Sequence, residues 1–342
     1  MSQKCILVTG AAGFIGFSTT RALLDRGDHV IGFDNLNPYY DPSLKRKRIE
    51  VLNQYPRFTF IEGDLEDQNT LEKLFHDFHP TEVINLAAQA GVRYSLEAPD
   101  VFLKSNLIGF HHLIECCRKW SVKHFVYASS GSVSGLNEQL PSSVEHVVAH
   151  PMSLYAATKR SNELYAHAYS HAFGLPTTGL RFFSVYGPWG RPDMVLFIFT
   201  RKMLAGDPIQ VFNSGHMTRD WTHISDIVDG IILSLDRPAQ PIDPTRSQQP
   251  LPVEASSAPF KLYHLGRGKP SSLLTAIDLL EQHLNIKSIR EYLPMQQCDV
   301  KDTYAEISAA KRDLGFNPKV DLNQGIKSFV DWYLEFYGKG DA

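Results

Sequence analysis

The chain has 342 residues, of which 43% are hydrophobic and 21% charged, and its formal net charge is −3 at pH 7. Such a composition is typical of a globular enzyme with one large or two smaller domains, and the small net charge excludes a global attraction to nucleic acid or anionic membranes. No apolar run approaches membrane-spanning length and no charged-then-apolar leader stands at the N-terminus, so we expect a cytoplasmic protein.

The cysteines and histidines give no pattern for a metal or a disulfide. The four cysteines, Cys5, Cys116, Cys117 and Cys298, have no C-x-x-C spacing, which argues against a zinc ribbon and fits a reducing compartment. His167 and His171 stand four residues apart, as two metal ligands on one helix face would, but no third ligand is evident. We therefore expect no metal.

A glycine-rich turn follows the first strand. The apolar run 6–8 predicts a buried strand, and the amphipathic segment 14–26 predicts a helix. Between them stand Gly10, Gly13 and Gly16. Glycines let the backbone turn sharply beside a pyrophosphate, and the helix N-terminus offers free N–H groups and partial positive charge. The spacing is G-x-x-G-x-x-G rather than G-x-G-x-x-G, so taken alone it also fits a simple tight turn.

An acidic residue after the second strand indicates which dinucleotide binds. The run 29–33 predicts a strand, and Asp34 follows it, 18 residues after Gly16. A carboxylate there accepts hydrogen bonds from both adenosine ribose hydroxyls and repels a 2′-phosphate, which favours NAD over NADP. The basic cluster Lys45–Arg48 is the opposing evidence because it could hold that phosphate. We interpret it as the solvated face of a helix.

Strands and helices then alternate. Further strands are expected at 58–62, 82–86, 125–128 and 176–183. One helix is expected to end near residue 54, and others to cover 71–78, 99–119 and 153–173. This order predicts an α/β fold, a Rossmann-type doubly wound parallel sheet that binds ligands outside the carboxyl ends of its strands. Asp64 follows the third strand, where it could bond an adenine amino group or only shape a turn. The small residues Ala87–Gly91 suit a backbone that passes close to a flat ligand.

The alternation becomes irregular beyond residue 183, which predicts a smaller, mixed C-terminal substrate-binding domain. We expect residues 1–183 to form the NAD-binding domain, with 220–236 and 260–266 returning to it. Residues 184–219 and 267–342 would form the second domain. Segment 237–259 is rich in Pro, Ser and Gln and is expected to be a flexible insertion. Helices are expected at 271–284, 307–314 and 322–337.

Ser130, Tyr155 and Lys159 form a second constellation of candidate residues. Tyr155 and Lys159 are four residues apart on one predicted helix, so they share a face, and Ser130 ends a predicted strand. A free phenol has a pKa of about 10, and a nearby ammonium together with the positive nicotinamide ring would lower it. These groups suit proton removal from an alcohol while hydride leaves its carbon. Y-x-x-x-K alone recurs by chance on helices.

At these residues the chain resembles the extended short-chain dehydrogenase/reductase family. Within it, the sequence is most similar to the nucleotide-sugar 4-epimerases that act on UDP-glucuronate. The resemblance covers nearly the whole chain, and the segments that carry it are 87–95, 153–159, 174–183 and 186–194.

The resemblance implies roles for individual residues. Tyr155, Lys159 and Ser130 would be catalytic. The expected NAD-binding residues are Gly10, Gly13, Phe14, Ile15, Gly16, Asp34, Asn35, Asp64, Leu65, Leu86, Ala87, Ala88, Gln89, Asn106, Tyr155 and Lys159. The expected UDP-sugar-binding residues are Arg93, Ser130, Ser132, Tyr155, Ser184, Arg191, Arg219 and Asp299. Arg191 would hold the sugar carboxylate, Arg219 the UDP phosphates and Asp299 the uridine ribose. For Arg219 and Asp299, a surface salt bridge and a turn residue are the alternatives.

The implied reaction is a closed redox cycle. Tyr155 would take the proton of the sugar 4-hydroxyl while hydride passes to NAD, and hydride would return to the other face of the rotated 4-keto sugar. A homodimer that pairs helices 99–119 and 153–173 is expected by analogy. Related dehydratases and decarboxylases carry acidic residues where this chain has Ser130-Gly131-Ser132, which disfavours both activities. A UDP-glucose or UDP-N-acetylhexosamine epimerase and a non-catalytic NAD-binding protein remain as alternatives.

Some positions depart from the family pattern. Ser134 stands where an aromatic residue is usual, and Gly131 where Ser or Thr is common. Ser134 could widen the sugar pocket, so these departures bear on which hexose the site accepts.

Overall fold

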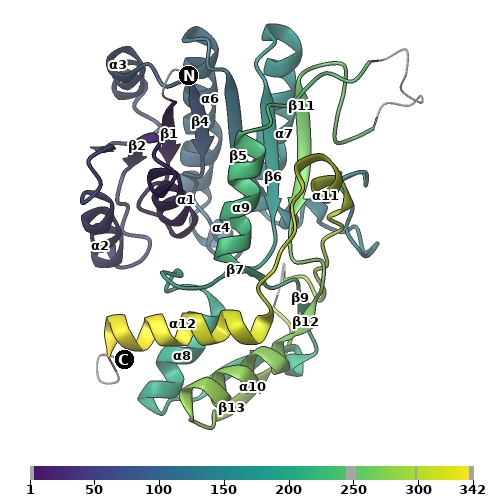
Figure 1. Cartoon of the computed structure of the whole chain (residues 1–342). Coiled ribbons are helices and arrows are strands. Elements are labelled where there is room, and N and C mark those ends of the chain that lie inside the picture. The colour runs from purple at the N-terminus through teal and green to yellow at the C-terminus, as the bar shows by residue number, and fades with distance from the viewer. Residues whose placement is uncertain (1–3, 244–251, 297–298, 339–342) are drawn as a thin grey trace.

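The chain is built around one parallel sheet (Figure 1). The computed structural model describes residues 4–243, 252–296 and 299–338. In it the seven strands stand in the order β11-β6-β5-β4-β1-β2-β3, and every neighbouring pair is parallel. The strands are β1 (Cys5–Thr9), β2 (His29–Asp34), β3 (Phe58–Glu62), β4 (Glu82–Asn85), β5 (His124–Ser130), β6 (Thr177–Phe182) and β11 (Phe260–Leu265). The predicted Rossmann-type sheet is confirmed.

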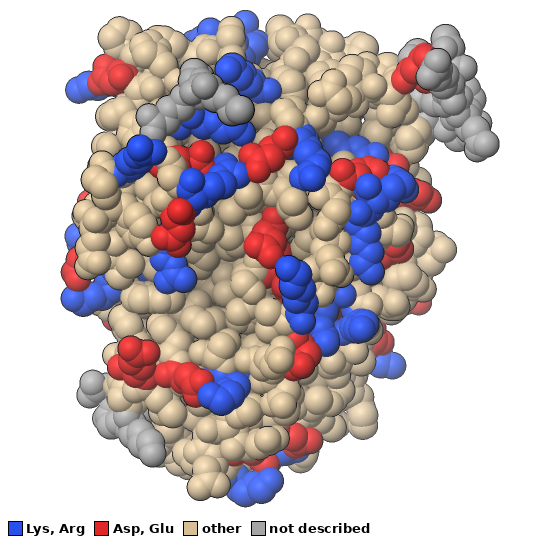
Figure 2. Space-filling view, viewed as in Figure 1, with Lys and Arg blue, Asp and Glu red and all other residues tan. Residues whose placement is uncertain are grey.

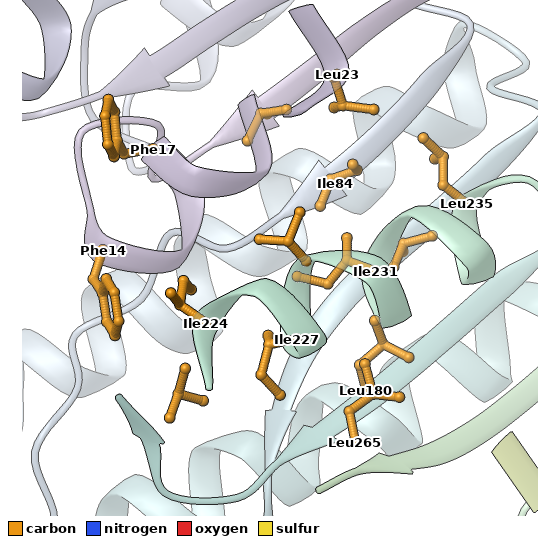
Figure 3. Close-up of a cluster of buried hydrophobic side chains, with 14 of the residues drawn as sticks. Phe14, Phe17, Leu23, Ile84, Leu180, Ile224, Ile227, Ile231, Leu235 and Leu265 are labelled. Carbon is orange, nitrogen blue, oxygen red and sulfur yellow. The ribbon is translucent and has the colours of Figure 1, made fainter. Parts of the chain in front are cut away.

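Helices cover both faces of this sheet. On one face lie α1 (Phe14–Asp25), α2 (Pro42–Leu52) and α9 (Ile224–Leu235), and on the other α3 (Gln68–Phe78), α6 (Gly109–Lys119) and α7 (Leu154–Phe173). Strand side chains alternate between the two faces, so Ile6 and Val8 enter one core while Leu7 enters the other. Figure 3 shows the first core, where α1 and α9 pack on the central strands.

Side chains cap the N-termini of several helices, but none caps the helix that follows the glycine turn. Ser153 Oγ accepts a hydrogen bond from Ala156 N at the start of α7, and Asp67, Ser272 and Asp321 do the same for α3, α10 (Leu273–Leu284) and α12 (Leu322–Tyr337). α1 begins after Gly13, and no side chain caps it. Its first N–H groups are therefore available to a ligand.

The predicted helix over residues 99–119 is not regular. It consists of α5 (Pro99–Leu103), a π-helical segment at Lys104–Ile108 and α6. A π turn inserts one extra residue into the helix and redirects the side chains that follow. Here the segment holds Asn106, which is 2% exposed and contacts the segment after β4.

The second half of the chain adds a separate core beneath the sheet. It is formed chiefly by α8 (Val195–Ala205), α10, α12 and β8 (Ile209–Phe212), and β8 pairs in parallel with β13 (Arg290–Leu293). The remaining elements are α4 (Tyr94–Glu97), the 3₁₀ turns Gly131–Ser134 and Asn213–Gly215, α11 (Ser308–Leu314), β7 (Val185–Tyr186), β9 (Thr218–Arg219), β10 (Thr222–His223) and β12 (Ser271–Ser272). The sequence predicted α10, α11 and α12 but neither α8 nor these short strands.

Part of the expected flexible insertion, residues 244–251, lies outside the described residues. On either side of that gap the chain is packed. Ile242 N donates to Ser256 O, Leu262 N donates to Glu254 O, and Ala255 and Ala258 are buried.

The surface shows no dominant charge on the face in Figure 2, where Lys and Arg side chains are interspersed with Asp and Glu. Among the described residues, no helix is both long and apolar enough to cross a membrane.

A buried ion pair joins α7 to the sheet. Arg181 on β6 and Glu163 on α7 are fully buried, and the guanidinium donates two hydrogen bonds, at 2.7 and 2.9 Å, to the carboxylate. Ser129 Oγ donates to the same carboxylate at 2.6 Å, and Arg160 donates at 2.8 Å. Burial raises the pKa of Glu163, but these donors outweigh it and lower the pKa below its usual value.

Removing one partner should therefore destabilise the fold strongly. We expect Glu163→Gln to lower the free energy of unfolding by about 3–5 kcal/mol, because it leaves the buried Arg181 charge uncompensated. Urea unfolding measures this change. Glu50→Gln, which removes the exposed Lys47–Glu50 pair, is the control and should cost less than about 1 kcal/mol. Equal small losses in the two variants would contradict the account.

Candidate active site

A cavity of about 340 Å³ opens at the carboxyl edge of the sheet. The glycine turn after β1 and the tips of β2, β4, β5 and β6 all contribute to its wall. Fifteen of the sixteen residues expected to bind NAD line it: Gly10, Gly13, Phe14, Ile15, Gly16, Asp34, Asn35, Asp64, Leu65, Leu86, Ala87, Ala88, Gln89, Tyr155 and Lys159. Residues spread over the first half of the sequence are thus brought to one place.

The glycine turn is so tight that its glycines cannot be replaced. A Cβ on Gly16 would lie 1.9 Å from Gly10 O, and one on Gly10 would lie 2.7 Å from Ala87 N. Gly10 also has φ +71°, which disfavours any other residue. The backbone between β1 and α1 therefore lies against the segment after β4, and the uncapped α1 N-terminus borders the cavity.

Asp34 lies at the tip of β2 and also borders the cavity. Its two carboxylate oxygens accept hydrogen bonds from Ala12 N at 3.0 Å and Leu36 N at 2.8 Å. Burial raises the pKa of Asp34, and the Lys45 ammonium opposes that rise. Each oxygen retains a lone pair for a ribose hydroxyl. Nearby, Asn35 Nδ2 donates to Asp64 Oδ2 at 2.8 Å, which fixes the next acidic side chain at the rim.

The interpretation of Lys45–Arg48 as a solvated helix face is wrong for two of its four residues. Arg46 and Lys47 are exposed, but Lys45 and Arg48 are buried on the side of α2 that faces the glycine turn. Lys45 Nζ donates to Asn37 O at 2.8 Å and lines the cavity. Burial lowers the pKa of Lys45, and Asp34 opposes that change. Lys45 is therefore engaged with Asp34 and with the loop after β2.

Tyr155, Lys159 and Ser130 meet in the same cavity. Lys159 is 3% exposed, and its Nζ donates to Ala128 O on β5 at 3.0 Å. Ser130 ends β5; its Oγ donates to Ser132 Oγ and accepts from Ser132 N, both at 3.1 Å. α7 and β5 thus place a phenol, an ammonium and a hydroxyl around one space.

The electrostatics of Tyr155 differ from the sequence-based expectation. Burial raises the pKa of the phenol, and the Ser130 hydroxyl and the Arg191 guanidinium only partly oppose this. Lys159 is not among the groups that shift it. Burial lowers the pKa of Lys159 itself to about 8. In the protein without cofactor, the phenol of Tyr155 therefore loses its proton less readily than free tyrosine does. The Lys159 ammonium does not reverse this rise in the pKa of Tyr155.

Asn106, the sixteenth expected NAD-binding residue, does not line the cavity. Its Oδ1 accepts from Gln89 N at 2.8 Å, and its Nδ2 donates to Gln89 O and to Thr158 Oγ1, both at 3.0 Å. The π-helical segment thereby holds the chain after β4 against α7, one residue before Lys159.

Arg191 lines the same cavity as Tyr155 and is paired with a carboxylate of its own loop. Its Nε donates to Asp193 Oδ1 at 2.9 Å and its Nη2 donates to Asp193 Oδ2; Tyr39 OH donates to Oδ2 at 3.2 Å. Burial alone would lower the pKa of Arg191, but Asp193 raises it. Nη1 makes no hydrogen bond to any residue that the structure describes, so it can donate to a further anionic or polar group.

A second cavity of about 240 Å³ adjoins the first, and the two share Ser130 and Ser184. Ser132, Arg219 and Asp299 also line it, and Arg219 Nη2 donates to Asp299 Oδ1 at 3.0 Å. Arg93 lies outside both cavities, half-exposed, with Nη2 at 3.4 Å from Asp299 Oδ2. The expected UDP-sugar residues thus follow a path from Tyr155 to Arg219, with Arg93 beside its far end.

The shape and donors of the first cavity fit a dinucleotide. Gly10 and Gly16 let the backbone of the turn pack closely on itself and on Ala87, so that the uncapped N-terminus of α1 faces the cavity where a diphosphate would bind, and Asp34 offers acceptors to a ribose. Among the described residues, no group of three His, Cys, Asp or Glu side chains is placed to hold a metal. His167 contacts Ser256 Oγ through its Nε2, at 2.9 Å.

Sequence reasoning missed several residues of the site. Arg48, Tyr39 and Asp193 were not proposed, and neither was the Glu163–Arg181 pair. Helical spacing could have found two of them. Arg48 is four residues from both Leu44 and Leu52, on the apolar side of α2, and Glu163 continues the face of Tyr155 and Lys159.

Comparisons with known proteins agree with this geometry. Residues 6–246 match the model of the NAD dependent epimerase/dehydratase family. Protein CapI of Staphylococcus aureus is 46% identical over 98% of this chain and 99% of its own length. UDP-glucuronate 4-epimerase 1 of Arabidopsis thaliana is 45% identical over 97% of this chain and 77% of its own. The UDP-glucuronic acid 4-epimerase of Bacillus cereus, solved with UDP-glucuronic acid and NAD, superposes with a TM-score of 0.85 at 31% identity, covering 97% of this chain and 100% of that one.

The glycine turn gives one test of cofactor binding. We expect Gly16→Ala to weaken NAD binding at least tenfold, because the added Cβ must displace Gly10 O and with it the backbone that faces the diphosphate. Titration calorimetry with NAD measures this. Gly206→Ala is the control, since its φ of +76° makes alanine unfavourable although nothing lies within 4 Å. It should cost stability and leave NAD affinity unchanged; equal NAD affinities in both variants would refute the role of the turn.

Lys159 gives a second test, through the pH dependence of stability. Its pKa of about 8 in the fold lies below the 10.5 of the unfolded chain, so burying the ammonium costs stability below pH 8. That cost disappears as the pH rises from 8 to 10.5. The free energy of unfolding of the wild type minus that of Lys159→Met should therefore increase between pH 7 and pH 10. Denaturant unfolding of cofactor-free protein at both pH values measures it, and a constant difference would contradict the burial of a charged Lys159.

Proposed function

Since the chain belongs to the NAD dependent epimerase/dehydratase family, we propose that it is an NAD-dependent 4-epimerase of a UDP-sugar, interconverting UDP-glucuronate and UDP-galacturonate. The observation that carries this proposal is the presence of Arg191 in the cavity that holds Tyr155, Lys159 and Ser130. A guanidinium at that place suits a sugar with a C6 carboxylate. The relatives that bear this activity in their names cover almost the whole chain.

The proposed roles follow the geometry. The residues that line the first cavity would hold NAD, which when bound would supply reversible hydride acceptance from C4 of the sugar. Tyr155 takes the proton of the 4-hydroxyl, and Ser130, which lines both cavities, holds the same oxygen. Lys159, whose Nζ donates a hydrogen bond to Ala128 O, contributes its positive charge to the site. Arg219 and Asp299 bind the nucleotide end of the substrate in the second cavity, and Ser184 lies between the two ends.

Control of the carboxylate separates epimerisation from decarboxylation. The 4-keto intermediate of a uronate is a β-keto acid, and it loses CO₂ when its carboxylate bond stands perpendicular to the ketone plane. The two carboxylate oxygens of Asp193 bind Nε and Nη2 of Arg191 along one edge of the guanidinium, so its remaining N–H groups have a fixed direction. A carboxylate bound by them cannot rotate freely, which preserves the intermediate for reduction.

The alternatives are weaker for local reasons. The turn after β5 presents Gly131 and Ser132 to the second cavity, where a related dehydratase would carry two acidic residues and a related decarboxylase a Glu in place of Ser132. A UDP-glucose-type 4-epimerase is the second candidate, because Asp193 already neutralises Arg191. A neutral hexose would then bind without an uncompensated charge.

We also propose that the protein is a cytoplasmic homodimer. Exposed apolar side chains gather on the two segments expected to pair: Val101, Leu103, Ile108, Leu154, Leu164, Tyr165 and Phe173. Burying this surface against a second copy would remove it from water. Sedimentation equilibrium would then give twice the mass of one chain.

The activity is tested by incubating the pure protein with UDP-glucuronate, without added NAD, and separating the products by chromatography. UDP-galacturonate is the expected product. A UDP-pentose would indicate a decarboxylase, and turnover of UDP-glucose but not UDP-glucuronate would indicate the second candidate. Both outcomes would overturn the proposed reaction.

Replacement of Arg191 tests how the carboxylate is held. We expect Arg191→Ala to lower kcat/KM for UDP-glucuronate at least tenfold and to raise the ratio of UDP-pentose to UDP-galacturonate, because the carboxylate becomes free to rotate. Product chromatography gives the ratio. Arg201→Ala, an exposed arginine on α8, is the control and should change neither quantity. An unchanged product ratio in Arg191→Ala would remove Arg191 from this role.

A further inference from the structure

Arg48 is a fully buried arginine that no step of the proposed reaction uses. It extends from α2 and joins segments that are distant in the sequence. Its Nη1 donates to Ala12 O, within the glycine turn, at 2.8 Å and to Tyr40 OH at 2.8 Å. Its Nη2 donates to Trp189 O at 2.5 Å and to Gly190 O at 3.3 Å. One guanidinium therefore holds the cofactor turn and the loop that leads to Arg191.

The loop at the other end of this link needs to be held. Trp189 has φ +62°, an unfavourable conformation for a residue with a side chain. Its ring packs against Phe17 of α1, with ring centroids 5.0 Å apart, and against Trp332 of α12. Arg48 donates hydrogen bonds to the backbone carbonyl groups of Trp189 and Gly190 in this turn, and Arg191 is the next residue in the chain. A shift of the glycine turn would thus be passed through Arg48 to the start of the Arg191 side chain.

The charge of Arg48 also matters. All four of its hydrogen-bond acceptors are neutral oxygens, and its Nε is buried without a partner among the described residues. A buried cation without a paired anion is costly. Within the chain the Asp34 carboxylate, which accepts from Ala12 N, is the nearby anion, but it forms no ion pair with Arg48 among the described residues. The diphosphate of a dinucleotide on the other side of the glycine turn would add a second negative charge, and Arg48 supports that turn through Ala12 O.

We infer that Arg48 is a positioning residue that couples NAD binding to the placement of Arg191. With the dinucleotide bound, the glycine turn, Arg48 and the 187–193 loop form one rigid unit, and Arg191 is aimed at the sugar carboxylate. This inference rests on the proposed function for the identity of the sugar, but the coupling itself is a binding property. It can be measured without turnover.

The experiment compares two variants of Arg48 with the wild type. Arg48→Met removes both the charge and the forked guanidinium group, whereas Arg48→Lys keeps the charge. Arg46→Met, at an exposed position on the same helix, is the control. Two quantities are measured for each protein. One is the NAD content after purification, by acid release and chromatography. The other is the ratio of the dissociation constants for UDP and UDP-glucuronate, by calorimetry on NAD-loaded and NAD-stripped protein. This ratio isolates the contribution of the sugar and its carboxylate.

In the wild type and Arg46→Met, loading with NAD should raise the UDP to UDP-glucuronate ratio. In Arg48→Met we expect about tenfold less retained NAD and no rise of the ratio on loading, as loss of charge-assisted hydrogen bonds predicts. Arg48→Lys should retain most of its NAD, but loading with NAD should no longer raise its UDP to UDP-glucuronate ratio, because a lysine cannot hold both carbonyl groups. If Arg48→Lys, and Arg48→Met where it folds, retain the wild-type rise, the coupling is refuted even if their thermal stability is lower.

These outcomes are separate from a failure of the proposed reaction. A wild-type protein that binds UDP-glucuronate without converting it would refute the epimerase activity. The dependence of its sugar affinity on NAD and Arg48 could still be measured and would decide the inference by itself.

Discussion

The burial of Lys159 and the partial burial of Tyr155 form the constraint that governs the site. Both groups lie beside the tip of β5, and their removal from water disfavours the charged form of each. The phenolate and the ammonium are therefore both costly in the chain alone. In the proposed role, Tyr155 would become an effective base only when a further positive charge enters the site, and the nicotinamide ring of oxidised NAD would bring one. Proton removal and hydride acceptance would then depend on the same cofactor state.

The fold supplies what this chemistry needs before any ligand is bound. The parallel sheet brings the tips of five strands to one edge, and the Glu163–Arg181 pair fixes α7 on β5 and β6 next to Lys159. Gly10 and Gly16 allow the cofactor turn to contact the chain after β4. Arg48 links that turn to the Arg191 loop. The cofactor and sugar portions of the site share a continuous set of buried polar contacts.

Local patterns made the first half of the fold predictable. Strand, glycine turn and helix follow one another in the sequence, and Asp34 and the Tyr155–Lys159 pair lie at spacings that secondary structure alone determines. The roles of Lys45 and Arg48 could not be read in this way. Their burial depends on carbonyl groups of the loops after β2 and around Trp189, far along the chain, so the local pattern predicts a solvated helix face where these two side chains are buried. The π segment around Asn106 and helix α8 likewise depend on packing that no short window contains.

The pKa of Tyr155 tests the central claim most directly. The protein has 14 tyrosines, so ¹³Cζ-tyrosine labelling with Tyr155→Phe for assignment lets NMR follow this one ring through a pH titration. The account predicts a pKa above 10 in cofactor-free protein and a value at least about one unit lower when oxidised NAD is bound. The same pKa in both states, or a value below 10 without cofactor, would contradict it.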